Sequence, residues 1–291
     1  MCRLFGLSAG ARAVSATFWL LEAPDSLAEQ SRRNPDGYGL ATFAPDGSPV
    51  VEKRPVAAYA DPLFACEAQE RRSPVFLAHV RYASRGADTP ANTHPFEQRG
   101  RVFAHNGHIG DVARLEQELG PDLDLVGGDT DSERFFALVT REIEAHGGDP
   151  AAGLAAAASW IAEHVALYAL NCLLATAEGI WALRYPDTHP LLMLERGQGG
   201  PSGARHFDGA SAAGRIRVRS GALADCPAVV FATEPMDEDA GWRALEPGEL
   251  VHVDRELRIS SHTAVARPPA HLLRLEDLEP HAAASQAASQ R

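Results

Sequence analysis

No two of the four cysteines stand close together in this sequence, which excludes the usual paired-cysteine motifs. Cys2, Cys66, Cys172 and Cys226 lack the CxxC spacing of zinc ribbons and thioredoxin-type redox sites. Long apolar runs are also missing: no stretch reaches about 18 uncharged apolar residues, so we expect no membrane span. Because no basic segment followed by an apolar run resembles a secretory signal, we expect a cytoplasmic protein without a disulfide framework.

Positive charge is in short supply as well. Lys and Arg total 27 against 39 Asp and Glu, which gives a formal net charge of −12. Such an acidic chain argues against nucleic acid or an anionic membrane as the main partner. The net charge does not exclude a small-molecule substrate of either charge. The phosphate-binding Gly-x-x-x-x-Gly-Lys-Ser/Thr motif is absent too, so no motif indicates an ATP-dependent domain.

What is present is a succession of strands, then helices, then strands. Strands are expected at 2–9, 38–43, 50–54, 75–82, 102–105, 170–175, 180–184, 191–195, 215–219, 229–233 and 250–253, and helices at 25–33, 61–71, 111–119, 130–146 and 151–165. This order favours two sheets with helices outside over a strictly alternating parallel fold. We expect one domain over 2–265, an exposed loop over 197–214, and a C-terminal extension over 266–291 that is a largely disordered tail.

Cys2 is the first candidate for chemistry. If Met1 is removed, this residue carries both a thiol and a free α-amine. The amine, with an ordinary pKa of about 7.7–8.0, can serve as the base that activates the thiol. Taken alone, a cysteine here is more typical of a buried thiol in a first strand.

Two strand ends carry further candidates. Strand alternation places His79 and Arg81 on one face, where Arg81 can bind a carboxylate through two parallel hydrogen bonds or form an ordinary surface ion pair. The run His105-Asn106-Gly107 ends another strand. A side-chain amide and a glycine N–H can direct two donors at one oxygen, as an oxyanion hole requires, although Asn-Gly is also a common hairpin turn.

A third polar cluster opens a helix. In Gly127-Gly128-Asp129-Thr130-Asp131-Ser132-Glu133, Thr130 or Asp129 can cap the helix, which leaves a further carboxylate able to bind an ammonium group. The several histidines between 79 and 108 raise a metalloenzyme as an alternative. Because Asn-Gly indicates a turn and no carboxylate or cysteine partner is placed nearby, we expect no metal and no cofactor.

Together these clusters resemble the class II glutamine amidotransferase domain of the N-terminal-nucleophile hydrolase superfamily, in its stand-alone form. The motifs that carry the resemblance, in order, are Met1-Cys2-Arg3-Leu4-Phe5-Gly6, Asn34-x-Asp36-Gly37-Tyr38-Gly39, His79-x-Arg81-Tyr82-Ala83-Ser84, His94-Pro95-Phe96, His105-Asn106-Gly107 and Asp129-Thr130-Asp131-Ser132-Glu133. Each is weak alone, but five in this order after a cysteine at position two are highly specific.

The resemblance implies an α+β fold, a four-layer αββα sandwich of two mainly antiparallel sheets. It also implies roles: Cys2 attacks a glutamine side-chain amide, Asn106 and Gly107 hold the oxyanion, and Arg81 binds the α-carboxylate. Asp131 would bind the α-ammonium, while Ser84, where relatives often have threonine, and His94 would help line the pocket. A γ-glutamyl thioester would form, release ammonia, and be hydrolysed to glutamate.

Several functions remain open under this resemblance. The chain either acts on glutamine and passes ammonia to a separate synthase subunit, or hydrolyses a larger γ-glutamyl amide, as does a relative in ergothioneine biosynthesis. A non-catalytic binding module with the same fold is a third hypothesis, which the presence of Cys2, Asn106-Gly107 and Asp131 disfavours.

Overall fold

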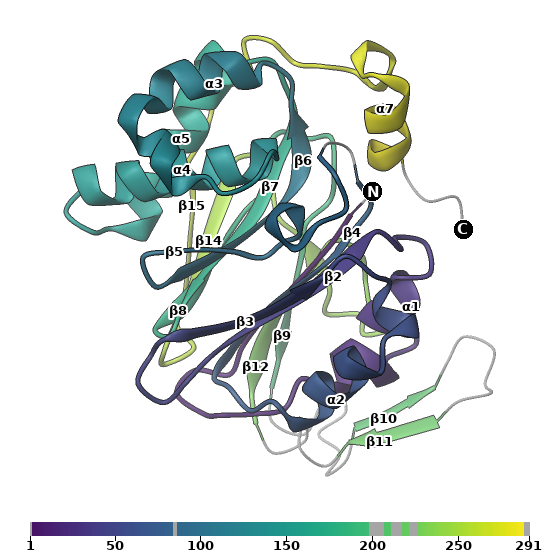
Figure 1. Ribbon diagram of the computed structural model, residues 1–291. Coiled ribbons are helices and arrows are strands. Elements are labelled where there is room, and N and C mark those ends of the chain that lie inside the picture. The colour runs from purple at the N-terminus through teal and green to yellow at the C-terminus, as the bar shows by residue number, and fades with distance from the viewer. Residues whose placement is uncertain (1, 84–85, 198–206, 211–216, 221–225, 288–291) are drawn as a thin grey trace.

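Two facing antiparallel sheets form the centre of the molecule (Figure 1). The computed structural model describes residues 2–83, 86–197, 207–210, 217–220 and 226–287. In spatial order, the seven-stranded sheet contains β13 (Arg243–Ala244), β9 (Leu192–Arg196), β12 (Ala228–Ala232), β1 (Arg3–Ser8), β4 (Val75–Arg81), β2 (Gly37–Phe43) and β3 (Pro49–Arg54). The six-stranded sheet contains β15 (Ile259–Thr263), β14 (Glu249–Asp254), β8 (Gly179–Leu183), β7 (Leu167–Thr176), β6 (Arg101–Ile109) and β5 (Phe96–Gln98).

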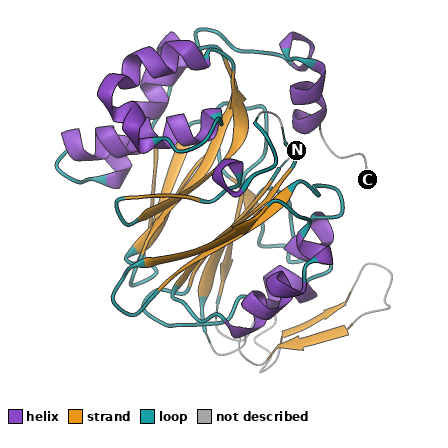
Figure 2. Cartoon of the chain, in the orientation of Figure 1, coloured by secondary structure: helices purple, strands orange, loops and turns teal. Residues whose placement is uncertain are grey.

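Helices cover the outer face of each sheet (Figure 2). The seven-stranded sheet packs against η1 (Phe18–Glu22), α1 (Leu27–Gln30) and α2 (Pro62–Glu70), and the six-stranded sheet against α3 (Val112–Leu119), α4 (Asp131–Ala145) and α5 (Pro150–His164). Short 3₁₀ turns lie at Ala58–Ala60, Pro90–Asn92, Gly120–Leu125 and Leu275–Asp277.

Strand alternation explains how the four layers are held together. In β1, Leu4 belongs to the core between the sheets, whereas its neighbour Phe5 packs against the outer helices. In β7, Leu173 points into the same inter-sheet core and Leu174 packs outward. Because both faces of these central strands are buried, most of their residues are apolar. The predicted four-layer α+β sandwich is confirmed.

Among the differences from the sequence predictions, two concern the expected loop and the expected tail. Within the expected loop 197–214, Phe207–Ala210 forms strand β10, which pairs with β11 (Arg217–Ser220); much of the remainder lies outside the described residues. The expected disordered tail instead contains helix α7 (Pro280–Gln286), whose Ala282 joins a small core with Tyr168 and Leu278. Its small side chains, which indicated disorder, allow this close packing. The domain boundary at 265 stays a prediction.

Candidate active site

Cys2 lies immediately before the central strand β1, at the point where the neighbouring strand β4 ends. Its Sγ is 3.2 Å from both the backbone N–H and the carbonyl oxygen of Tyr82, so the thiol accepts one hydrogen bond and can donate another. Burial raises the pKa of the Cys2 thiol, an effect that the Tyr82 N–H and the nearby Arg81 and Arg3 partly offset. A thiol held in its neutral form needs a base before it can attack a carbonyl carbon.

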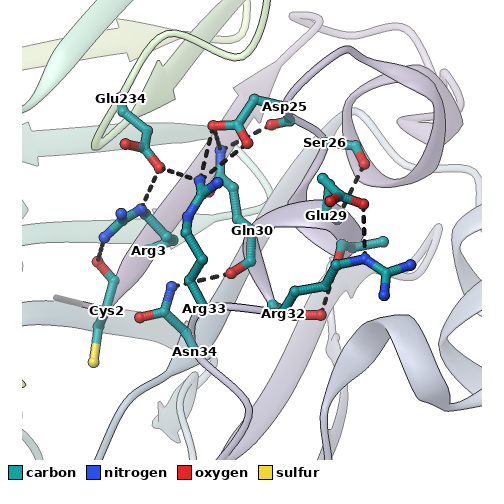
Figure 3. A network of polar contacts seen from close by, with 12 residues as sticks. Cys2, Arg3, Asp25, Ser26, Glu29, Gln30, Arg32, Arg33, Asn34 and Glu234 are labelled. Atoms are coloured by element: carbon teal, nitrogen blue, oxygen red, sulfur yellow. Dashed lines mark hydrogen bonds and ion pairs between the residues drawn. The ribbon is translucent and has the colours of Figure 1, made fainter. Parts of the chain in front are cut away.

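Arg3 holds the backbone of Cys2 from the opposite side (Figure 3). The buried Arg3 guanidinium donates to the Cys2 carbonyl oxygen at 3.4 Å and forms an ion pair with Glu234, which also pairs with Arg33 at 2.9 Å. Burial favours the neutral form of Glu234, but the two guanidinium groups outweigh it and lower the pKa of this carboxyl. Figure 3 shows the Cys2 carbonyl turned toward Arg3 and the sulfur directed away from it.

The predicted carboxylate-binding residue, Arg81, ends strand β4 and is buried. Its guanidinium forms an ion pair with Asp88 and donates to the Gly86 carbonyl oxygen at 3.2 Å. Asp88 itself is largely exposed, so the carboxylate that the Arg81 guanidinium binds lies at the edge of the site. Asp36, from the Asn34–Gly39 motif, accepts the Ala83 N–H at 2.9 Å and thereby holds the turn that follows Arg81.

Asn106 and Gly107 lie inside strand β6, where the alternative prediction of a hairpin turn is wrong. The Asn106 side chain is fully buried, and neither its Oδ1 nor its Nδ2 has a hydrogen-bond partner among the described residues. An unsatisfied buried amide costs about 1–3 kcal/mol, which makes Asn106 a candidate for contact with a ligand. At position 107 a Cβ atom would overlap the Ala169 carbonyl oxygen, and only glycine fits.

Asp131 is the first residue of helix α4, which Thr130 caps by accepting the Glu133 N–H. The buried Asp131 carboxylate accepts the N–H of Ile109 at 2.8 Å and that of Ser132 at 3.0 Å. It therefore connects the start of α4 to β6, two residues beyond Gly107. Backbone donors already stabilise its negative charge, and a substrate ammonium would be an additional partner.

His79 and His94 are in ring contact, with centroids 4.3 Å apart. The carbonyl of His94 passes so close to β2 that a Cβ atom at Gly39 would overlap it, which explains this glycine of the motif. Neither ring has a hydrogen-bond partner among the described residues. Desolvation, reinforced by neighbouring cationic groups, lowers the pKa of His79 to about 3 and that of His94 well below its usual value.

These two pKa shifts predict that the folded state is destabilised by mild acid. Each histidine titrates near pH 6.5 when unfolded but much lower when folded, so the unfolded chain binds more protons as the pH falls. Each should remove about 1.4 kcal/mol of unfolding free energy between pH 7.5 and 5.5. Urea denaturation of wild type and His79→Phe at both pH values tests this. The decrease in unfolding free energy between pH 7.5 and 5.5 should be smaller in the variant by about 1.4 kcal/mol. The exposed His281→Ala serves as control, and equal pH dependence in all three proteins would contradict the prediction.

The structure brings most of the predicted residues to one region. Strands β1 and β4, which position Cys2 and Arg81, both contact β6, which carries Asn106 and Gly107, and Asp131 hydrogen-bonds to the end of β6. His94 is packed on His79, two residues before Arg81. Ser84 lies outside the described residues.

Within the described residues, no three His, Cys, Asp or Glu side chains are arranged to hold a metal ion. Across those same residues, every helix is too short or too polar to cross a membrane.

Three residues near the site were not singled out from the sequence. Asn171 lies opposite Asn106 in the pairing of β6 with β7, and the buried Gln286 contacts both Gly107 and His189. No local motif surrounds any of them, and Gln286 falls in an Ala/Ser/Gln-rich segment typical of a solvated tail. Only the tertiary contacts identify them.

Comparisons with known proteins bear on the family and the fold. The chain is 30% identical over 267 residues to the gamma-glutamyl-hercynylcysteine sulfoxide hydrolase of Mycobacterium tuberculosis, covering 88% of this chain and 94% of the relative. Its fold is similar to a class II glutamine aminotransferase domain protein from Silicibacter pomeroyi (TM-score 0.59, 20% identity, 91% and 100% covered).

A larger enzyme shares the fold. The chain resembles the glutamine phosphoribosylpyrophosphate amidotransferase from B. subtilis, with a TM-score of 0.61 and 18% identity. The likeness covers 92% of this chain and spans half the length of that enzyme. The family model for class II glutamine amidotransferases matches residues 1–272, and this chain therefore belongs to the class II glutamine amidotransferase family.

Proposed function

We propose that the chain is an amidohydrolase in which Cys2 attacks the side-chain amide of glutamine or of a γ-glutamyl amide. The observation that carries this proposal is the buried Asn106 carboxamide, which lacks a partner in the described structure and lies on a strand facing β1. Its Nδ2 and the Gly107 N–H supply two donors for an oxyanion. A purely structural asparagine would have its hydrogen bonds satisfied, as Asn171 does.

In the proposed reaction the α-amine of Cys2, freed by removal of Met1, takes the thiol proton as Sγ bonds to the amide carbon. The tetrahedral intermediate collapses when that proton passes to the leaving nitrogen, which departs as ammonia or an amine. Water then attacks the γ-glutamyl thioester and breaks its C–S bond, which releases glutamate and regenerates the Cys2 thiol. The α-carboxylate of the substrate would replace Asp88 as the partner of Arg81. The α-ammonium group of the substrate would approach Asp131.

The identity of the leaving amine distinguishes two candidates. Glutamine as substrate implies a separate partner that accepts ammonia. A larger γ-glutamyl amide does not, and this second candidate is favoured by the match to the M. tuberculosis hydrolase over nearly its whole length.

A panel of glutamine, γ-glutamyl anilides and γ-glutamyl thioether amides, incubated with wild type and assayed for glutamate, separates the candidates. Turnover of glutamine supports the ammonia-producing function, and turnover of only the larger amides supports the hydrolase. If no member is hydrolysed, the chain is better described as a binding module and the proposed function fails.

A further inference from the structure

Helix α7 brings a glutamine side chain against the proposed oxyanion residue. The Gln286 Nε2 donates to the carbonyl oxygen of Gly107 at 3.1 Å, although 179 positions separate the two residues. Gln286 is almost completely buried, and helix α7 packs near strand β6. The family match ends at residue 272, so Gln286 lies outside the matched segment and Gly107 inside it.

The orientation of the Gln286 amide follows from its partners. A carbonyl oxygen can only accept, so Nε2 must be the atom that faces Gly107. The Oε1 then faces His189 Nε2 at 3.0 Å, which requires the hydrogen of that ring to be on Nε2. Burial lowers the pKa of His189 to about 4, so the ring is a neutral donor near pH 7.

The other end of this chain of hydrogen bonds is anchored on strand β7. The carbonyl oxygen of His189 accepts the Asn171 Nδ2 at 3.0 Å and the Arg184 Nε at 2.9 Å. Asn171 lies opposite Asn106 in the strand pairing. The hydrogen bonds therefore run from Asn171 in β7 through His189 and Gln286 to Gly107 in β6. Gly107 is next to the Asn106 amide, which has no hydrogen-bond partner among the described residues.

We propose that Gln286 is a positioning residue, which orients the Gly107 peptide so that its N–H points at the developing oxyanion. Glycine has the widest backbone freedom of any residue, and the direction of its N–H depends on how the adjoining peptide groups are restrained. The hydrogen bond from Gln286 restrains the peptide that follows Gly107. This inference rests on the proposed function, because it assigns Gly107 an oxyanion to bind.

The test compares kcat and KM of Gln286→Leu, Gln286→Glu and the exposed control His281→Ala with wild type, on the amide that wild type hydrolyses best. Complete loss of one oxyanion donor costs about 10²–10³ in kcat, so a misdirected donor should cost about 10- to 100-fold with little change in KM. His281→Ala should match wild type. A raised KM with unchanged kcat, or no change at all, would overturn the positioning role.

Gln286→Glu adds a readout that a merely structural role would not produce. A carboxylate still accepts from His189 but repels the Gly107 carbonyl, whereas a protonated carboxyl can donate to it. Burial raises a carboxyl pKa, so kcat of this variant relative to wild type should rise as the pH falls from about 8 to about 6. A flat ratio would contradict the inference even if Gln286→Leu proved too unstable to assay.

The inference and the proposed function fail in different ways. Absence of wild-type turnover removes both, whereas wild-type turnover that the Gln286 variants leave intact removes only the inference.

Discussion

Cys2→Ala is expected to lower kcat for γ-glutamyl amide hydrolysis by at least about 10⁴, because no other group can form the acyl thioester. The described contacts support a specific role for this sulfur: it is the cysteine that lies at the end of β1, against the Tyr82 backbone and beside β6. Glutamate release, followed at substrate concentrations above KM, measures the loss.

The matched control for this variant is Cys66→Ala, which removes an exposed thiol on α2. It should retain wild-type activity. Intact-mass analysis should also show that Met1 is absent and that a glutamine-like electrophile labels Cys2 alone. Activity in Cys2→Ala, or a fully active enzyme that retains Met1, would contradict the proposed mechanism.

Asn106→Val is expected to lower kcat by about 10²–10³ while raising the free energy of unfolding by about 1 kcal/mol. The activity falls because an oxyanion donor is lost. The stability rises because a buried amide that has no hydrogen-bond partner in the described part of the chain is replaced by an apolar side chain suited to a strand. Such opposite effects are expected where a site retains a polar group for function at a cost in stability.

Asn171→Val provides the matched control, since it makes the same substitution at the position paired with Asn106. The Asn171 amide accepts the Tyr185 N–H and donates to the carbonyl oxygens of His189 and Pro190. Its removal takes this partner from the Tyr185 N–H and the Pro190 carbonyl, while the His189 carbonyl keeps its bond from Arg184. The substitution should destabilise the fold by about 1–3 kcal/mol. Urea denaturation of both variants measures the contrast; if Asn106→Val is as destabilising as Asn171→Val, the Asn106 amide has a structural role.

The strands and helices near the site followed from local sequence patterns. The apolar runs around Leu77 and Leu173 predicted strands because both of their faces are buried, and Thr130 was one of two predicted caps for a helix that it does begin. At Asn106-Gly107 the same kind of reasoning favoured a turn, and the structure shows a strand. Asn-Gly suits a tight turn, but here the close approach of Ala169 and the pairing with β7 override that local preference.

The sequence by itself indicated the family, most of the strands and helices near the site and the candidate nucleophile, because these depend on residue types at short spacings. Tertiary structure decided how the candidates are used. It showed that Arg3 and Glu234 hold Cys2, that Arg81 is paired with Asp88, and that the Asn106 amide has no partner in the described structure. It also brought Gln286 to Gly107 across 179 positions. Hydrogen bonds between distant segments depend on how the sheets and helices pack, and local patterns of residues do not predict them.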